Sequence, residues 1–154
     1  MKKIIIIMAL IILAIIAGIF LITYHKAEAD VTETATKVGV IMNGSKNDRS
    51  WNQAHYEGLE KTAAELNLDI TYKECVTEDK VTEIINGFAK DNCKIIIAGS
   101  FEFGKYMVEG AEKYPEIFFF HATGTESGKN MSSYFGRMYQ MRYLSGIVAG
   151  MQTE

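Results

Sequence analysis

The chain has 154 residues, enough for one domain, and carries 16 Lys and Arg against 19 Asp and Glu, a net charge of −3. Three of those lysines and one glutamate lie within residues 1–29, so the remainder carries −5. An acidic domain without clusters of Arg and Lys lacks the electrostatic footprint of a nucleic-acid-binding protein, which excludes that class of function.

The N-terminal segment has the features of an export signal. An apolar run, Ile4 to Ile22, follows two lysines, and Ala27-Glu28-Ala29 has the form of a signal-peptidase site. The run is longer than the core of a typical signal peptide and reaches the length of a membrane span. Residues 1–29 are therefore predicted to be either a cleaved signal peptide or an uncleaved membrane anchor, followed by a polar tether over 30–36. Either way, the domain from residue 37 is expected outside the cytoplasmic membrane, periplasmic or at the cell surface.

Short apolar segments alternate with helical patterns over 37–154. Strands are predicted near 37–42, 69–75, 94–98 and 117–121, with a weaker fifth within 130–136, and helices at 50–67, 77–91, 101–114 and 139–151. In the first helix, the apolar positions that approximate a core-facing stripe are Trp51, Ala54, Leu59, Ala63 and Leu66. This order predicts an α/β lobe of three layers, with a parallel sheet between helices.

The chain has two cysteines, Cys75 and Cys93. They are expected at the C-terminal end of one strand and the N-terminal end of another. Parallel strands place those ends at opposite edges of the sheet, too far apart for a disulfide. Free, semi-buried thiols are therefore predicted, and the pair lacks the spacing of metal ligands.

Three loops, 43–51, 99–104 and 121–127, leave the C-terminal ends of predicted parallel strands and should gather at one rim, where ligands bind in such sheets. Trp51, the only tryptophan, begins a helix there among polar residues. It is either a core residue of that helix or a platform on which a ligand stacks. The polar neighbours favour the platform.

Polar side chains surround this tryptophan in the sequence. Each could be a turn or helix-cap residue, or could hydrogen-bond a neutral ligand such as a nucleoside, a sugar or an amino acid. The candidates are Asn43, Asp48, Ser50 and Asn52.

Two further loops supply candidates. In "AGSFEFG", one of Phe101 and Phe103 is expected to face the crevice and the other to pack inward. His121 and Thr123 form either a rim pair or a structural pair. Because the sequence contains neither a phosphate-binding loop nor a recognisable nucleophile–base pair, no enzyme activity, no cofactor and no metal site is predicted.

Three stretches resemble the basic membrane protein family of substrate-binding proteins of ABC importers, whose best-known members bind purine nucleosides. They are "KVGVIMNGSKNDRSWNQAHYEGLEK", "IIIAGSFEFGKYMVEGAEKYPEIFFFHATG" and "NMSSYFGRMYQMRYLSGIVAGMQTE". The resemblance implies a type I periplasmic-binding-protein fold. It also implies that Trp51 is the aromatic that stacks on the base, with Asp48, Ser50 and Asn52 as the polar positions around it.

The chain departs from the family at several positions. His121-Ala122-Thr123-Gly124 stands where members carry an acidic residue, "RMYQMRYLSG" replaces a His-Glu pair, and the lipid-bearing cysteine is absent. Family members have two lobes and about twice this length, so residues 37–154 are expected to be the N-terminal lobe alone. The predicted function is a solute-binding protein that delivers a small polar, nucleoside-like ligand to an importer permease. The alternative is a membrane-anchored extracellular sensor domain.

Overall fold

The computed structural model describes residues 15–20 and 34–153, so most of the predicted signal or anchor segment and most of the predicted tether lie outside the described residues. Among the described residues, no helix is long and apolar enough to cross a membrane. Residues 35–154 form one compact unit. Its elements are β1 (Thr36–Ile41), α2 (Trp51–Leu66), β2 (Leu68–Lys73), α3 (Glu78–Lys90), β3 (Ile95–Ala98), a 3₁₀ turn (Phe101–Phe103), α4 (Gly104–Lys113), β4 (Phe118–Ala122), β5 (Met131–Tyr134) and α5 (Met138–Gln152).

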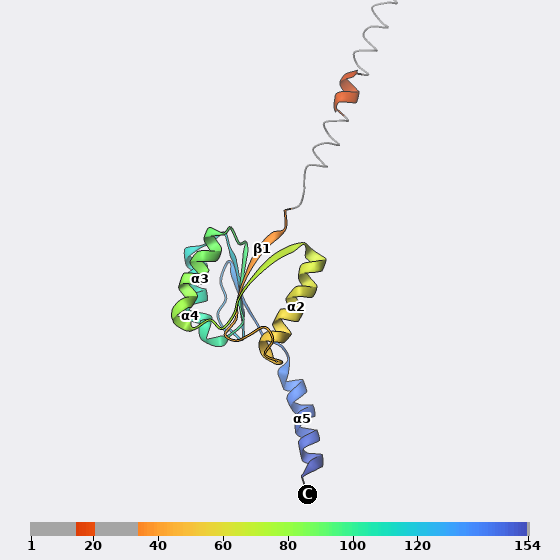
Figure 1. Cartoon of the computed structure of the whole chain (residues 1–154), viewed down its shortest axis with the longest axis vertical. Coiled ribbons are helices and arrows are strands. Elements are labelled where there is room, and N and C mark those ends of the chain that lie inside the picture. Colours follow the sequence, from red (N-terminus) through yellow and green to blue (C-terminus); the bar gives the residue numbers. More distant parts are fainter. Residues whose placement is uncertain (1–14, 21–33, 154) are drawn as a thin grey trace, which may run out of the picture. The chain divides into compact units, whose positions relative to one another are not determined.

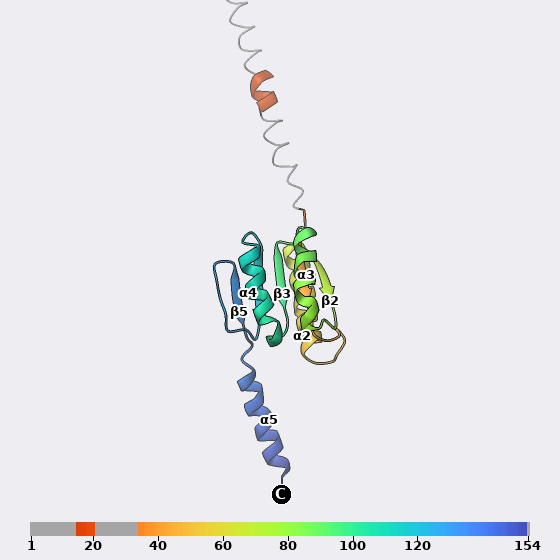
Figure 2. The same cartoon turned by 90° about the vertical axis from the view of Figure 1, so that its left-hand side faces the viewer.

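The sheet has five strands in the order β2-β1-β3-β4-β5, and every neighbouring pair is parallel. The helices α3 and α4 lie on one face and α2 on the other, as the two views show (Figures 1 and 2). The predicted α/β lobe with parallel strands is therefore confirmed. The first two strands pair in parallel, with Val38 opposite Ile70, as expected for strands joined by a crossover helix.

The main core lies between the sheet and the α3–α4 layer. It is dense because alternate strand residues and one stripe of each helix are apolar. In α3 that stripe consists of the buried residues Val81, Ile85 and Phe88. The edge of Phe88 lies against β1 at Gly39, where a Cβ atom would come within 2.4 Å of the ring. Glycine at this position lets the helix approach the strand.

The predicted stripe of α2 is wrong in part. The residues that face the sheet are Asn52, Tyr56 and Leu59, whereas Ala54 is exposed and Leu66 is 64% exposed. The start of the helix is held by hydrogen bonds from Asn52 to the carboxylate of Asp48. Leu66 is in the last turn, where the helix gives way to β2.

Both cysteines are free, as predicted, but neither is semi-buried. Cys75 is exposed, and Cys93 is buried beside the start of β3. Burial raises the pKa of the Cys93 thiol, which keeps it protonated.

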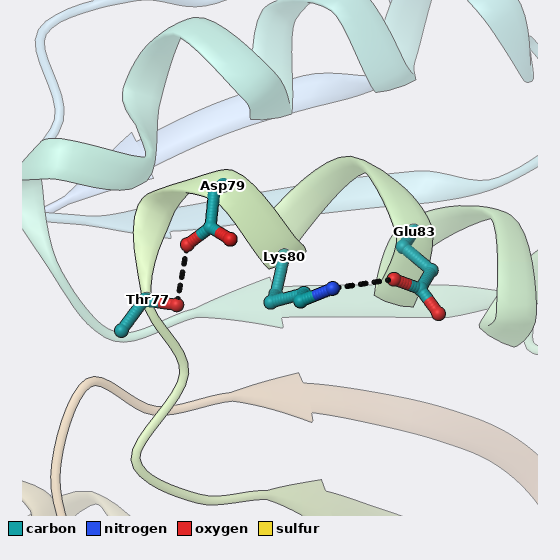
Figure 3. A network of polar contacts seen from close by, with 4 residues as sticks. All are labelled: Thr77, Asp79, Lys80 and Glu83. Atoms are coloured by element: carbon teal, nitrogen blue, oxygen red, sulfur yellow. Dashed lines mark hydrogen bonds and ion pairs between the residues drawn. The ribbon is translucent and has the colours of Figure 1, made fainter.

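The first turn of α3 borders the rim described below. Thr77 Oγ1 donates a hydrogen bond of 2.6 Å to Asp79, and Lys80 forms an ion pair with Glu83 at 3.4 Å (Figure 3). Both partners of the ion pair are largely exposed. Exposed pairs of this kind contribute little to stability. Their effect here is to keep this corner of the rim polar.

Candidate ligand-binding rim

A crevice is expected where the loops after two neighbouring parallel strands turn to opposite faces of the sheet. In this sheet those neighbours are β1 and β3. The loop after β1 leads to α2 on one face, and the loop after β3 leads to α4 on the other (Figure 1). The predicted rim loops 43–51 and 99–104 therefore meet at the switch point of the sheet.

A polar cluster links these two loops. Asn43 Nδ2 donates to Ser100 Oγ at 2.9 Å and to Glu102 Oε1 at 3.0 Å, and Ser100 Oγ donates to the other carboxylate oxygen of Glu102. Burial acts to raise the pKa of Glu102, but hydrogen bonds from Ser100, its own backbone N–H and Asn43 outweigh it and lower the pKa. Glu102 is therefore an ionised acceptor at neutral pH. It lines an open pocket of about 580 Å³ together with Asn43.

Asp48 stabilises the start of α2 rather than lining the crevice. Its carboxylate accepts hydrogen bonds from the backbone N–H groups of Ser50, Asn52 and Gln53, and from Asn52 Nδ2 at 2.9 Å. Asn52 is only 6% exposed, and Ser50, at the cap position, makes no side-chain cap bond. Of the polar residues proposed as possible caps from the sequence, Asp48 accepts the N–H groups at the start of the helix. The side chain of Asn52 is used within the protein.

These hydrogen bonds give Asp48 a defined effect on stability. Burial acts to raise the pKa of Asp48, but the hydrogen bonds from Asn52, Gln53 and Ser50 outweigh it and lower the pKa from 3.8 to about 2. The ionised form is thus favoured by folding, so its stabilising contribution is complete above pH 3.8 and is lost as the pH falls through about 2.

Asp48→Ala is therefore expected to lower the melting temperature at pH 6, and the gap from the native chain should narrow between about pH 4 and pH 2. Thermal melts of both chains, monitored by circular dichroism at several pH values, would measure the difference in melting temperature. Glu65→Ala, at an exposed position near the other end of the same helix, is the control and should change little. A gap that stays constant down to pH 2 would contradict the capping role.

Trp51 is partly exposed and is held in one orientation. Its Nε1 donates a hydrogen bond of 2.6 Å to the carbonyl oxygen of Gly99, immediately after β3. The ring lies 4.5 Å from that of His55 and 6.4 Å from that of Phe135, measured between centroids. The indole therefore sits at the C-terminal edge of the sheet with its polar edge satisfied and part of its surface open.

The two phenylalanines of the loop after β3 separate as expected. Phe101 is 67% exposed, whereas Phe103 is fully buried in the main core. Phe103 therefore has no surface to offer a ligand, while Phe101 borders a pocket of about 360 Å³ with Glu102 and Lys105.

His121 and Thr123 lie beneath the rim. His121 is 1% exposed, and its Nε2 lies 2.7 Å from the carbonyl oxygen of Ser100, an acceptor, so Nε2 carries the proton. Its Nδ1 and Thr123 Oγ1 are buried without a hydrogen-bond partner among the described residues. A Cβ atom on Gly124 would lie 2.2 Å from that Nδ1, so the glycine backbone packs against the ring. His121 thus positions Ser100 from below.

The loops after β1 and β3 are joined at the switch point by the bonds from Asn43 to Ser100 and from Trp51 to Gly99, whereas Phe101 borders a separate pocket. Of the other sequence candidates, Asp48 and Asn52 cap α2, Phe103 and His121 are buried, and Ser50 is exposed beside Trp51. Sequence reasoning missed Ser100 and Glu102. They follow the strand that neighbours β1, and this adjacency was the signal that could have paired them with Asn43. No group of three or more His, Cys, Asp or Glu that could hold a metal ion occurs within the described part of the chain.

The family model described as ABC transporter substrate-binding protein, PnrA-like, matches residues 35–154. The chain belongs to this family. Two relatives are each 32% identical: a putative ABC transporter glucose-binding protein of Haloferax volcanii, over 70% of this chain, and a purine-binding protein of Brucella abortus, over 79%. The chain spans only 28% and 36% of their lengths.

A solved solute-binding protein of Conexibacter woesei shares the fold. It superposes with a TM-score of 0.66 at 21% identity, over 75% of this chain and 40% of its own. The fold of this PnrA-like chain is therefore that of one part of a larger solute-binding protein.

Proposed function

We propose that residues 37–154 are the recognition lobe of an extracytoplasmic solute-binding protein of an ABC importer, and that the ligand is a nucleoside. The family membership supports the transport role. The observation that supports the ligand class is the partly exposed Trp51, which bonds the carbonyl oxygen of Gly99, next in the chain to Ser100 of the Asn43–Ser100–Glu102 cluster.

The two groups suit the two parts of a nucleoside. An indole has a broad π-face on which a purine base can stack, a contact worth about 0.5–1.5 kcal/mol beyond area burial. The Glu102 carboxylate is ionised and accepts hydrogen bonds, as the hydroxyl groups of a ribose require. The purine-binding relative points to the same ligand class, and the glucose-binding relative provides the competing one.

Calorimetric titration of the full chain with inosine, guanosine, uridine and glucose tests the ligand class. A purine nucleoside is expected to bind and to raise the melting temperature. At a ligand concentration about 100 times the Kd, the added stability is about 2.7 kcal/mol. Uridine should bind more weakly because its base has one ring, and glucose should not bind. Binding of glucose alone, or of none of the four, would refute the proposal.

The proposed transport role also implies the binding partner of this lobe. A ligand-loaded lobe on the outer side of the membrane would pass its solute to an importer permease, and the acidic charge of the exported part gives nucleic acid no basic surface. The proposal assigns the chain binding without catalysis.

A further inference from the structure

Three helix starts gather at the rim, and in an open α/β sheet such helix N-termini are where anionic groups are usually held. α2, α3 and the 3₁₀ turn that leads into α4 each follow a strand, so they begin at the edge where the parallel strands end. The first N–H groups of a helix have no partner within it, and the helix dipole adds positive charge there. What these helix starts contact therefore decides whether the rim can hold a phosphate group.

At each of the three helix starts the chain places a carboxylate of its own. Asp48 accepts hydrogen bonds from three backbone N–H groups at the start of α2. Glu78 and Asp79 are in the first turn of α3, where Thr77 Oγ1 donates to Asp79 at 2.6 Å (Figure 3). Glu102 lies in the 3₁₀ turn before α4 and accepts a hydrogen bond from its own N–H group. The positive ends of these helices are therefore already offset by negative charge within the chain.

Negative charge also dominates the two pockets that meet at Glu102. The pocket of about 580 Å³ is lined by three carboxylates, and none of the described residues that line it is basic. The three are Glu78, Asp79 and Glu102. The pocket of about 360 Å³ shares Glu102, adds Glu126 and contains one cation, Lys105. Lys105 Nζ lies 3.9 Å from a carboxylate oxygen of Glu109, so its charge is partly offset within α4.

The buried histidine beside the rim offers an acceptor as well. His121 is 1% exposed, and because its Nε2 carries the proton toward the carbonyl oxygen of Ser100, its Nδ1 presents a lone pair. That Nδ1 has no partner among the described residues. Gly104 and Gly124 line the 360 Å³ pocket with His121, and a Cβ atom on either glycine would lie within 3.5 Å of Nδ1. A ligand group that satisfied Nδ1 would have to donate a hydrogen bond, which a phosphate dianion cannot do.

We propose that this rim selects against ligands that carry an anionic group, and that Glu78, Asp79 and Glu102 determine this specificity. The rim then accepts a nucleoside and rejects the corresponding phosphate ester. The inference rests on the proposed function, because it takes the ribose to lie at Glu102. A ribose held there places its phosphate in or beside the two pockets that share this residue. A phosphate monoester carries about −1.5 to −2 charges at neutral pH, so the carboxylates repel it.

This selection also sets the place of the lobe in a reaction sequence. A nucleoside monophosphate becomes a ligand only after its phosphate ester has been hydrolysed, a reaction that consumes water and releases the nucleoside and inorganic phosphate. A reaction of this class on the outer side of the membrane therefore has to supply the nucleoside. The released phosphate does not compete for the rim, because the same carboxylates repel it.

Calorimetric titration of the full chain with inosine and with inosine 5′-monophosphate tests the selection. At an ionic strength of about 0.01 M, where the Debye length is about 30 Å, the monophosphate should bind more than about tenfold more weakly than inosine. At about 1 M, where the Debye length is about 3 Å, the difference should shrink. Equal affinities at low salt would overturn the proposal. A difference that does not change with salt would also overturn it, because a steric obstacle rather than charge would then exclude the phosphate.

A double variant tests the residues. Glu78→Gln with Asp79→Asn removes two of the charges and keeps an oxygen that accepts the bond from Thr77, and the ratio of the two dissociation constants should fall by about threefold or more. Glu65→Gln with Asp69→Asn is the matched control. It removes two exposed charges at the opposite edge of the sheet, so the ratio should stay that of the native chain.

The outcomes separate this inference from the proposed function. An unchanged ratio in Glu78→Gln with Asp79→Asn, or the same fall in the control, would overturn the specificity assigned to these residues while inosine still binds. Absence of inosine binding to the native chain would refute the proposed function, and the inference with it.

Discussion

Phe103→Ala is expected to destabilise the lobe more than any other change in the loops of the rim. The side chain is fully buried in the main core, among residues from β1, α3 and α4. Truncating a buried phenylalanine costs about 3–5 kcal/mol, because apolar contact is lost and a cavity remains. Natural domains have free energies of unfolding of about 5–15 kcal/mol, so this loss would greatly increase the unfolded fraction. Urea denaturation followed by circular dichroism would measure the loss.

Phe101→Ala is the matched control, since it removes the same side chain from the same loop. Phe101 is 67% exposed, so its removal should change stability by no more than about 0.5 kcal/mol. If the two variants lost similar stability, the assignment of Phe103 to the core and Phe101 to the rim would be wrong.

The sheet could be predicted from the sequence because its signals are local. The Ile95–Ala98 run is apolar, and β-branched isoleucines make up most of it. Strands and helices alternate along the chain, and this order predicts a parallel sheet with helical crossovers. The observed bounds of β1 and β4 differ from the predicted ones by one residue.

The candidate site was less predictable because it depends on contacts between distant parts of the chain. The bond between Asn43 and Ser100 joins residues 57 apart, and it exists only because β1 and β3 are neighbours in the sheet. The sequence also cannot show which polar residues serve the protein itself. Asp48 and Asn52 look like ligand-binding residues, yet their hydrogen-bonding groups are used to start α2.

Periodicity alone likewise misassigned the side of α2 that faces the sheet. Apolar residues occur on two sides of this helix, and one of those sides, with Trp51 and Ala54, lines an open groove toward the end of β5 rather than the core. Because the apolar residues are spread over both sides, the stripe identified from the sequence is buried only in part.

Trp51→Ala is expected to weaken binding of a purine nucleoside more than about tenfold. Loss of stacking removes about 0.5–1.5 kcal/mol, and the contact area of the indole adds to this, while a factor of ten corresponds to about 1.4 kcal/mol. The hydrogen bond from Nε1 to Gly99 is also lost, which should cost the lobe about 1 kcal/mol of stability. Calorimetric titration and thermal melts of the same preparations would separate the two effects.

Trp51→Phe distinguishes stacking from the hydrogen bond. It keeps an aromatic face in the same place but has no Nε1, so it should lose the stability that the Gly99 bond provides and retain most of the affinity. His55→Ala removes the ring beside the indole from the groove side and should leave affinity close to that of the native chain. Unchanged affinity in Trp51→Ala, together with a large fall in melting temperature, would mean that the indole serves only to join α2 to the end of β3. The remaining argument for an aromatic ligand would then disappear, because Phe101, the other exposed aromatic of these two loops, has no bond that fixes its orientation toward the polar cluster.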